Sequence, residues 1–276
     1  MPATMRPGEL RRVAIKATLF FYITALIFSP LQAQAATDMG VSPSKLELLL
    51  DPGESTTEII RVTNSAPDRI HFKAYVMDWL LSQEGEFTPI PPGTGERSAS
   101  SWAKVVPIEF DLGPEQTQDV RVSISVPRGV SGEYRTVVFF ESAPSQVSGM
   151  FGVSVVGRIG VVVYVNIRGT IKREGGVADL TVDYDRSKEM LTGRIGFENT
   201  GNTHLVLNAT VELKDAGGRR VALIEETRGV CLPESYVQLP FRWQGTLSPG
   251  EYIVLAVIDY GGATRIAGQT VLEVPE

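Results

Sequence analysis

Residues 151–167 alternate between two kinds of side chain. The odd-numbered positions from Phe151 to Ile167 are apolar except for Gly157, whereas the even-numbered positions mix polar residues, glycine and valine. A period of two indicates a β-strand, because successive side chains of a strand point to opposite faces. The segment is about three times as long as a usual strand of ~5–6 residues. So long an apolar face is hard to cover within one small domain, and it predicts a strand that pairs beyond its own sheet.

The rest of the chain also has the pattern of short strands. No helical periodicity of useful length occurs, and 27 glycines and 17 prolines supply many turns. About seven strands precede residue 168 and about seven follow residue 177, which is the spacing of an immunoglobulin-like sandwich. We therefore expect an all-β protein with two immunoglobulin-like β-sandwich domains in tandem. The expected domains are 36–168 and 177–276, joined by a charged linker with glycines at 169–176.

The first 35 residues have the parts of a secretory signal peptide. Four basic residues precede an apolar run at 17–28, and Ala33-Gln34-Ala35 matches the small-residue cleavage pattern. The run is shorter than the ~20 residues that cross a bilayer. We expect residues 1–35 to be cleaved and the remaining chain to be a soluble periplasmic protein without a membrane span.

The net charge restricts the class of partner, and the cysteine content restricts the disulfides that the chain can form. The net charge of −6 includes +3 from the expected leader, so the exported chain carries about −9. Nucleic-acid binders display clustered positive charge, and this balance disfavours such a partner. Cys231 is the only cysteine, which excludes a disulfide within the chain, and its apolar neighbours predict a buried small side chain.

No motif predicts an enzyme, a metal site or a cofactor. His71 and His204 lie in different expected domains without nearby metal-type ligands, and His71 fits a surface position of a strand. Asp183 and Asp185 share a strand face, which is typical of solvated charge rather than of a hydrolase pair. We expect the tryptophans to pack in cores or at their edges; the sharper alternative is a glycan platform.

Short motifs occur in a fixed order between residues 40 and 168. They are Val41-Ser42-Pro43, Asp51-Pro52-Gly53-Glu54, Asp78-Trp79, Leu112-Gly113-Pro114, Gly132-Glu133-Tyr134-Arg135 and the closing alternating strand. This set resembles the amino-terminal domain of the periplasmic pilus-assembly chaperones, the PapD-like family. The resemblance implies that the last strand of this domain is lent to exported pilus or surface-fibre subunits, a case of β-strand addition.

The resemblance implies specific roles in the last strand. Phe151, Val153 and Val155 would form the donor segment, while residues 159–165 would anchor the strand in its own domain. The alternative is that all nine odd positions are ordinary core. An exposed strand edge also predicts a capacity for self-association.

Members of this family hold the terminal carboxylate of the subunit with two basic residues. Lys45 and Arg158 are the candidates here, since arginine binds carboxylates bidentately. The chain departs from the family pattern because Gly160 stands near the expected lysine. Ordinary surface charges are the alternative for both residues.

The second domain resembles immunoglobulin-like modules only generally. Its segments 197–204, 247–252 and 259–262 are also similar to the carboxy-terminal domain of WxL-associated cell-wall-binding proteins. A secreted structural or cell-wall-binding module is therefore the alternative to a chaperone, and a carbohydrate-active enzyme is the least supported reading.

Overall fold

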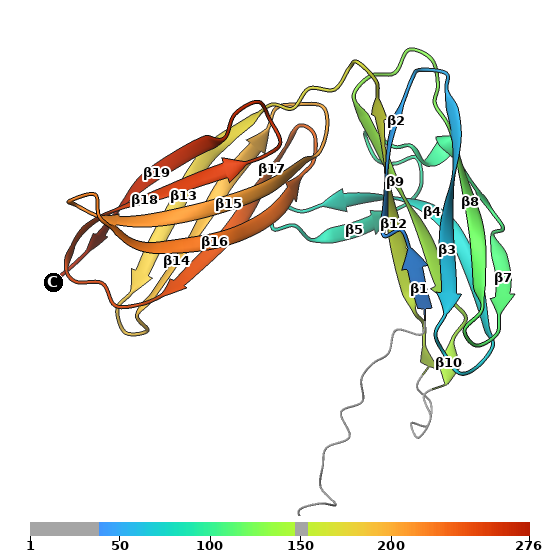
Figure 1. Ribbon diagram of the computed structural model, residues 1–276, viewed down its shortest axis with the longest axis horizontal. Helices are drawn as coiled ribbons and strands as arrows, with labels where there is room; N and C mark the ends of the chain where they lie inside the picture. The colour runs from blue at the N-terminus through green and yellow to red at the C-terminus, as the bar shows by residue number, and fades with distance from the viewer. Residues whose placement is uncertain (1–38, 147–153) are drawn as a thin grey trace, which may run out of the picture. The chain divides into compact units, whose positions relative to one another are not determined.

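The computed structural model describes residues 39–146 and 154–276, with the exception of several side chains at 145, 146, 154, 225 and 226. Strands make up nearly all of its regular structure, and one short 3-10 helix, η1 (Ser100–Trp102), accompanies them (Figure 1). In the described part, none of the helical structure is long and apolar enough to cross a membrane. The prediction of an all-β protein with two tandem sandwiches is confirmed.

The first sandwich has two antiparallel or mixed sheets. The four-stranded sheet has the order β1 (Met39–Ser42), β3 (Ser55–Asn64), β8 (Thr117–Ser125), β6 (Ala103–Val106). The facing sheet has the order β2 (Lys45–Leu50), β12 (Arg158–Ile167), β9 (Glu133–Ser142), β4 (Ile70–Leu81), β5 (Phe87–Ile90), and β7 (Glu109–Leu112) also pairs with β4. Figure 1 shows β12 beside β9.

Two segments that the sequence pattern predicts as single strands are divided between the sheets. The segment 41–50 becomes β1 and β2, with Pro43 between them, and the segment 105–112 becomes β6 and β7, with Pro107 between them. Proline has no backbone N–H and cannot continue a hydrogen-bonded ladder, so the chain leaves one sheet and joins the other. As a consequence β1 pairs with β3, while β2 pairs with β12.

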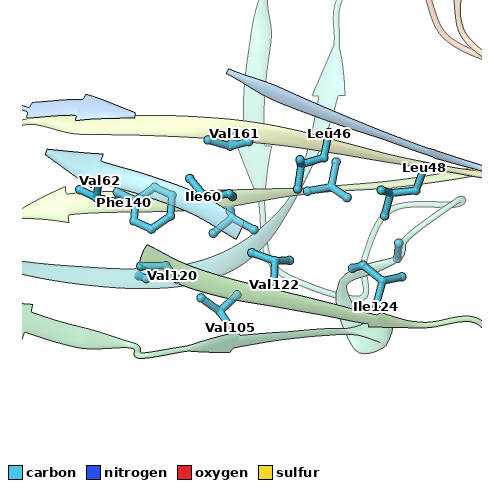
Figure 2. Close-up of a cluster of buried hydrophobic side chains, with 14 of the residues drawn as sticks. Leu46, Leu48, Ile60, Val62, Val105, Val120, Val122, Ile124, Phe140 and Val161 are labelled. Atoms are coloured by element: carbon cyan, nitrogen blue, oxygen red, sulfur yellow. The ribbon is translucent and has the colours of Figure 1, made fainter. Parts of the chain in front are cut away.

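Alternating side chains from both sheets fill the first core. In Figure 2, Leu46 and Leu48 of β2 and Val161 of β12 lie across from β3 and β8, whose labelled members include Ile60 and Val122. Ile60, Val122 and Val161 are fully buried. This core therefore needs β2 and β12 in register, because a slip of one residue would turn their apolar sides to solvent.

The second sandwich is built in the same manner around a separate core. Its three-stranded sheet has the order β13 (Gly175–Asp185), β14 (Met190–Asn199), β17 (Ser235–Gln244). Its four-stranded sheet has the order β16 (Arg220–Cys231), β15 (Leu205–Asp215), β18 (Gly250–Asp259), β19 (Ile266–Val274). Inward residues such as Phe197, Leu207 and Val254 are fully buried. Only 168–174 connect β12 to β13, so β13 begins inside the segment predicted as linker.

The lone cysteine and the three tryptophans lie in or beside the cores. Cys231 is buried, and burial raises the pKa of its thiol. Trp79 is buried, and Trp102 and Trp243 pack partly buried against the two cores. These findings confirm the predicted packing roles. His71 lies on the exposed side of β4 and contacts Asp111, as expected of a surface position.

Candidate strand-donor edge

The long alternating segment is two strands rather than one. β11 (Ser154–Val155) pairs with β10 (Ser145–Gln146), and β12 begins three residues later at Arg158. In β12 the register pairs Arg158 with Glu141, and continuing it would place Val155 opposite position 144. Val155 instead lies opposite Ser145, so the β9–β10 side carries one extra residue, as in a β-bulge. Phe151 and Val153 of the predicted donor segment lie outside the described residues.

Burial changes along the apolar side of this segment. Val161, Val163, Val165 and Ile167 are fully buried, and Ile159 is partly buried. Val155, by contrast, is 49% exposed. The alternative that every odd position belongs to the core is therefore wrong at Val155, whereas it holds from Val161 onward.

The two ends of β12 also differ in pairing. β9 pairs with it from Arg158 to Asn166, but β2 begins opposite Val162. Within the described residues, positions 158–161 thus have a strand on one side only. On the side away from β9, these positions form part of the sheet edge.

Two backbone hydrogen bonds at the ends of β12 show which backbone groups face that open side. The Ser142 N–H donates to the Gly157 carbonyl toward β9, whereas the Arg168 N–H donates to the Leu50 carbonyl toward β2. Backbone groups alternate in direction along a strand. Arg158 and Gly160 therefore direct their N–H and C=O toward the open side, where a further strand would find them.

An aromatic ring lies over the outer face of this end. A Cβ atom on Gly160 would lie 2.8 Å from Cε1 of Phe139, so only glycine leaves room for the ring. The Arg158 guanidinium lies over the same ring, 4.7 Å from its centroid. Next to it the Tyr75 hydroxyl donates to Oε2 of Glu141 at 2.6 Å, and burial together with this carboxylate raises the pKa of Tyr75.

Lys45 and Arg158 share a face but are not neighbours. Lys45 lies opposite Val162, four positions along β12 from Arg158, which corresponds to about 13 Å of strand. Nζ of Lys45 is 2.6 Å from Oε1 of Glu47, and this contact is the main cause that lowers the pKa of Glu47. The guanidinium of Arg158 packs over the Phe139 ring. Their joint role as a carboxylate anchor stays a prediction.

A buried polar cluster lies next to β12, and no pattern in the sequence predicted it. Glu133 is fully buried, and its Oε2 accepts hydrogen bonds from the Thr203 hydroxyl at 2.8 Å, the His204 N–H at 3.1 Å and the His204 ring at 2.5 Å. The His204 ring stacks on Tyr164 with centroids 3.9 Å apart. Glu133 and His204 are 71 positions apart in the chain, and no local motif links them.

The described residues hold no group of three or more histidine, cysteine or carboxylate side chains that would suit a metal ion. Asp183 faces outward on β13, and Asp185 contacts Lys188 at 2.8 Å. That contact and the Ser187 hydroxyl lower the pKa of Asp185 to about 2. Both aspartates lie in solvated surroundings, as the sequence analysis expects.

Comparisons with known proteins give structural matches alone. No family model matches the chain, and the search of curated proteins gives no significant match. The class 5 fimbriae chaperone CfaA is 15% identical, with a TM-score of 0.43 over 86% of this chain and 100% of that one. A chain of the chaperone–tip subunit complex CsuC–CsuE of Acinetobacter baumannii is 12% identical, with a TM-score of 0.45 over 84% and 97%.

A third similar structure is a complex of the SafA pilin with the SafB chaperone of Salmonella enterica, 13% identical, with a TM-score of 0.43 over 86% of this chain and 99% of that one. These three similar structures are a fimbrial chaperone and two complexes that contain a chaperone and its subunit. The architecture itself rests on the strand pairing described above.

Proposed function

We propose that this chain is a periplasmic chaperone-like protein that binds exported pilus or surface-fibre subunits by β-strand addition along β11 and β12. One observation carries the proposal. Positions 158–161 of β12 have a strand on one side only within the described residues, and the exposed Val155 precedes them. In strand addition, main-chain hydrogen bonds supply affinity and alternate side chains supply specificity.

The geometry supports a donor that stays anchored. The second half of β12 lies between β2 and β9 and fully buries the side chains of Val163, Val165 and Ile167, so it holds the strand in place. The first half offers the backbone of Arg158 and Gly160 to a partner. Such a role needs no catalytic group and no cofactor, and cleavage of the leader expected at 1–35 would release the protein where exported subunits pass.

The backbone and the side chain of Arg158 can be tested separately. Arg158→Pro removes the N–H that faces the open side and leaves the bonds to β9, and proline is tolerated at the first residue of a strand. Arg158→Ala is the matched control, since it removes the guanidinium and keeps the N–H. The readout is the amount of exported subunit that co-purifies with the tagged protein from the periplasm.

We expect Arg158→Pro to lower co-purification about tenfold, because losing one backbone hydrogen bond costs up to about 1.4 kcal/mol, whereas Arg158→Ala should change it about twofold or less. Circular dichroism checks that both variants keep the fold. Unchanged co-purification with folded Arg158→Pro would contradict strand addition at this edge. An equal loss in both variants would assign the binding to the guanidinium instead.

A further inference from the structure

Glu133 and Arg135 of β9 both have buried polar atoms without a partner. Oε1 of Glu133 and the Nε and Nη1 atoms of Arg135 form no hydrogen bond with any of the described residues. The two residues are two positions apart, so their side chains lie on one face of the strand, with Cα atoms about 6.6 Å apart. A buried polar group without a partner destabilises the folded state, and a charged group does so more strongly. The present arrangement is therefore unfavourable at both residues.

The guanidinium of Arg135 lies over an aromatic ring instead of against a carboxylate. Its Cζ atom is 5.5 Å from the centroid of the Trp79 ring. The void beside the guanidinium, which Asp78 and Trp79 also line, has no room for a water molecule. Burial lowers the pKa of Arg135, and the negative charge of Glu133 is the main cause that opposes this shift. The two charges thus attract each other although they form no ion pair.

The other carboxylate near Arg135 is already engaged. Asp78 accepts hydrogen bonds at both oxygens, from the Gly95 N–H at 3.0 Å and from the Ser98 hydroxyl at 2.7 Å. Glu133 has an oxygen that accepts none from the described residues. It is therefore the carboxylate that can take Arg135 as a new partner.

Glu133 at present depends on donors from the other sandwich. Its Oε2 atom accepts hydrogen bonds from the Thr203 hydroxyl, the His204 N–H and the His204 ring. Both residues immediately precede β15, outside the first sandwich. When this segment moves away from β9, the carboxylate loses all three donors together, whereas Arg135 stays beside it on the same strand.

We propose that Glu133 and Arg135 form a partner-exchange switch at the contact between the two sandwiches. In the first state, Glu133 binds Thr203 and His204, and Arg135 lies over Trp79. In the second state, residues 203 and 204 have left β9, and Arg135 turns from the ring to Glu133. The guanidinium fork then donates to both carboxylate oxygens. The new ion pair replaces the lost donors and makes separation of the two sandwiches at this contact easier.

Hydrogen exchange at the His204 backbone amide measures the second state. This N–H donates to Oε2 of Glu133 at 3.1 Å, so it exchanges when the contact opens. The variant is Arg135→Met in the purified protein, because methionine keeps an unbranched side chain over Trp79 and removes the guanidinium. We expect exchange at His204 to become at least threefold slower, since the second state loses its ion pair. A purely supporting role of Arg135 predicts the opposite sign, because the variant would then loosen the first state.

Two further variants separate pairing from other effects. Arg121→Met removes an exposed arginine of the same sandwich and should leave the rate at His204 unchanged. In a Glu133→Gln background, Arg135→Met should slow the exchange less than in the parent protein, because no carboxylate remains to form the pair. The amide of Val165 in β12 serves as the reference for opening of the whole sandwich.

The result that supports the switch is slower exchange at His204 that depends on Glu133 and exceeds any change at Val165. Faster or unchanged exchange at His204 in Arg135→Met would overturn the proposal. Equal slowing in the Glu133→Gln background would overturn the pairing, and an equal change at Val165 would assign the effect to global stability instead.

Discussion

The two halves of β12 share a sequence pattern and differ in surroundings. Residues 162–167 lie between β2 and β9, and their odd side chains are fully buried. Residues 158–161 have β9 alone among the described strands, and Val155 before them is half exposed. The difference arises on β2, which begins only at Lys45 because the chain changes sheets at Pro43. An apolar alternation therefore marks a strand, while the neighbouring strand decides which part of it is left open.

The largest expected contrast between the halves comes from a charge in the core. Val163→Asp places a carboxylate at a fully buried position of the second half, and we expect it to destabilise the protein by at least about 4 kcal/mol. Ile159→Asp, in the partly buried first half, should cost about 2 kcal/mol. Chemical denaturation measures both. Equal losses would show that the two halves are equally enclosed.

The second half is also held by the buried carboxylate beside it. Glu133→Ala removes the acceptor of three hydrogen bonds from Thr203 and His204, and we expect a loss of about 3 kcal/mol in the free energy of unfolding. Thr203→Val removes one of the three and should cost about 1 kcal/mol. Thermal denaturation of both variants measures these values. A loss below that of Thr203→Val would show that Glu133 does not organise the cluster.

The open half depends on the absence of a side chain at position 160. Gly160→Ala places a methyl group 2.8 Å from Cε1 of Phe139, and we expect it to cost about 2 kcal/mol through overpacking. Phe139→Leu in the same chain should remove part of that penalty, because the ring is gone while Cγ2 of Val137, 2.9 Å from the same methyl position, remains. The double-mutant cycle is read from urea denaturation. Additive losses would contradict the contact between the methyl group and the ring.

The smallest effect concerns the exposed pair at the start of β2. Lys45 lowers the pKa of Glu47 below its ordinary value of 4.5, so the ionised carboxylate stabilises the folded state above that pH. This contribution is lost as the pH falls through the folded-state pKa. Because Lys45 is largely exposed, Lys45→Met should cost only a few tenths of a kcal/mol at pH 7.

The same variant should show a slightly flatter dependence of stability on pH below 5 than the parent protein. Melting temperatures between pH 3 and pH 7 measure it. A steeper dependence in Lys45→Met would contradict the assigned cause of the pKa shift.

Local sequence patterns predicted the strands wherever two conditions held together, alternation and turn residues at both ends. The strand Ile70–Leu81 is an example, since its apolar series begins after Asp68 and ends before the turn near Gly85. The pattern failed at Pro43 and Pro107, because alternation continues across each proline while the ladder does not. The pattern also predicted β11 and β12 as one strand, because apolar alternation continues where the chain changes from pairing with β10 to pairing with β9.

The period of two, the apolar series that fills both cores and the lone cysteine can be seen in the amino-acid sequence alone, because side-chain alternation and composition are local properties. The folded chain was needed to show that β2 covers half of β12 and that Glu133 meets His204. Each of these depends on the register between strands that are distant in the chain. Register is a property of pairs of strands, and no single strand's sequence specifies its partner.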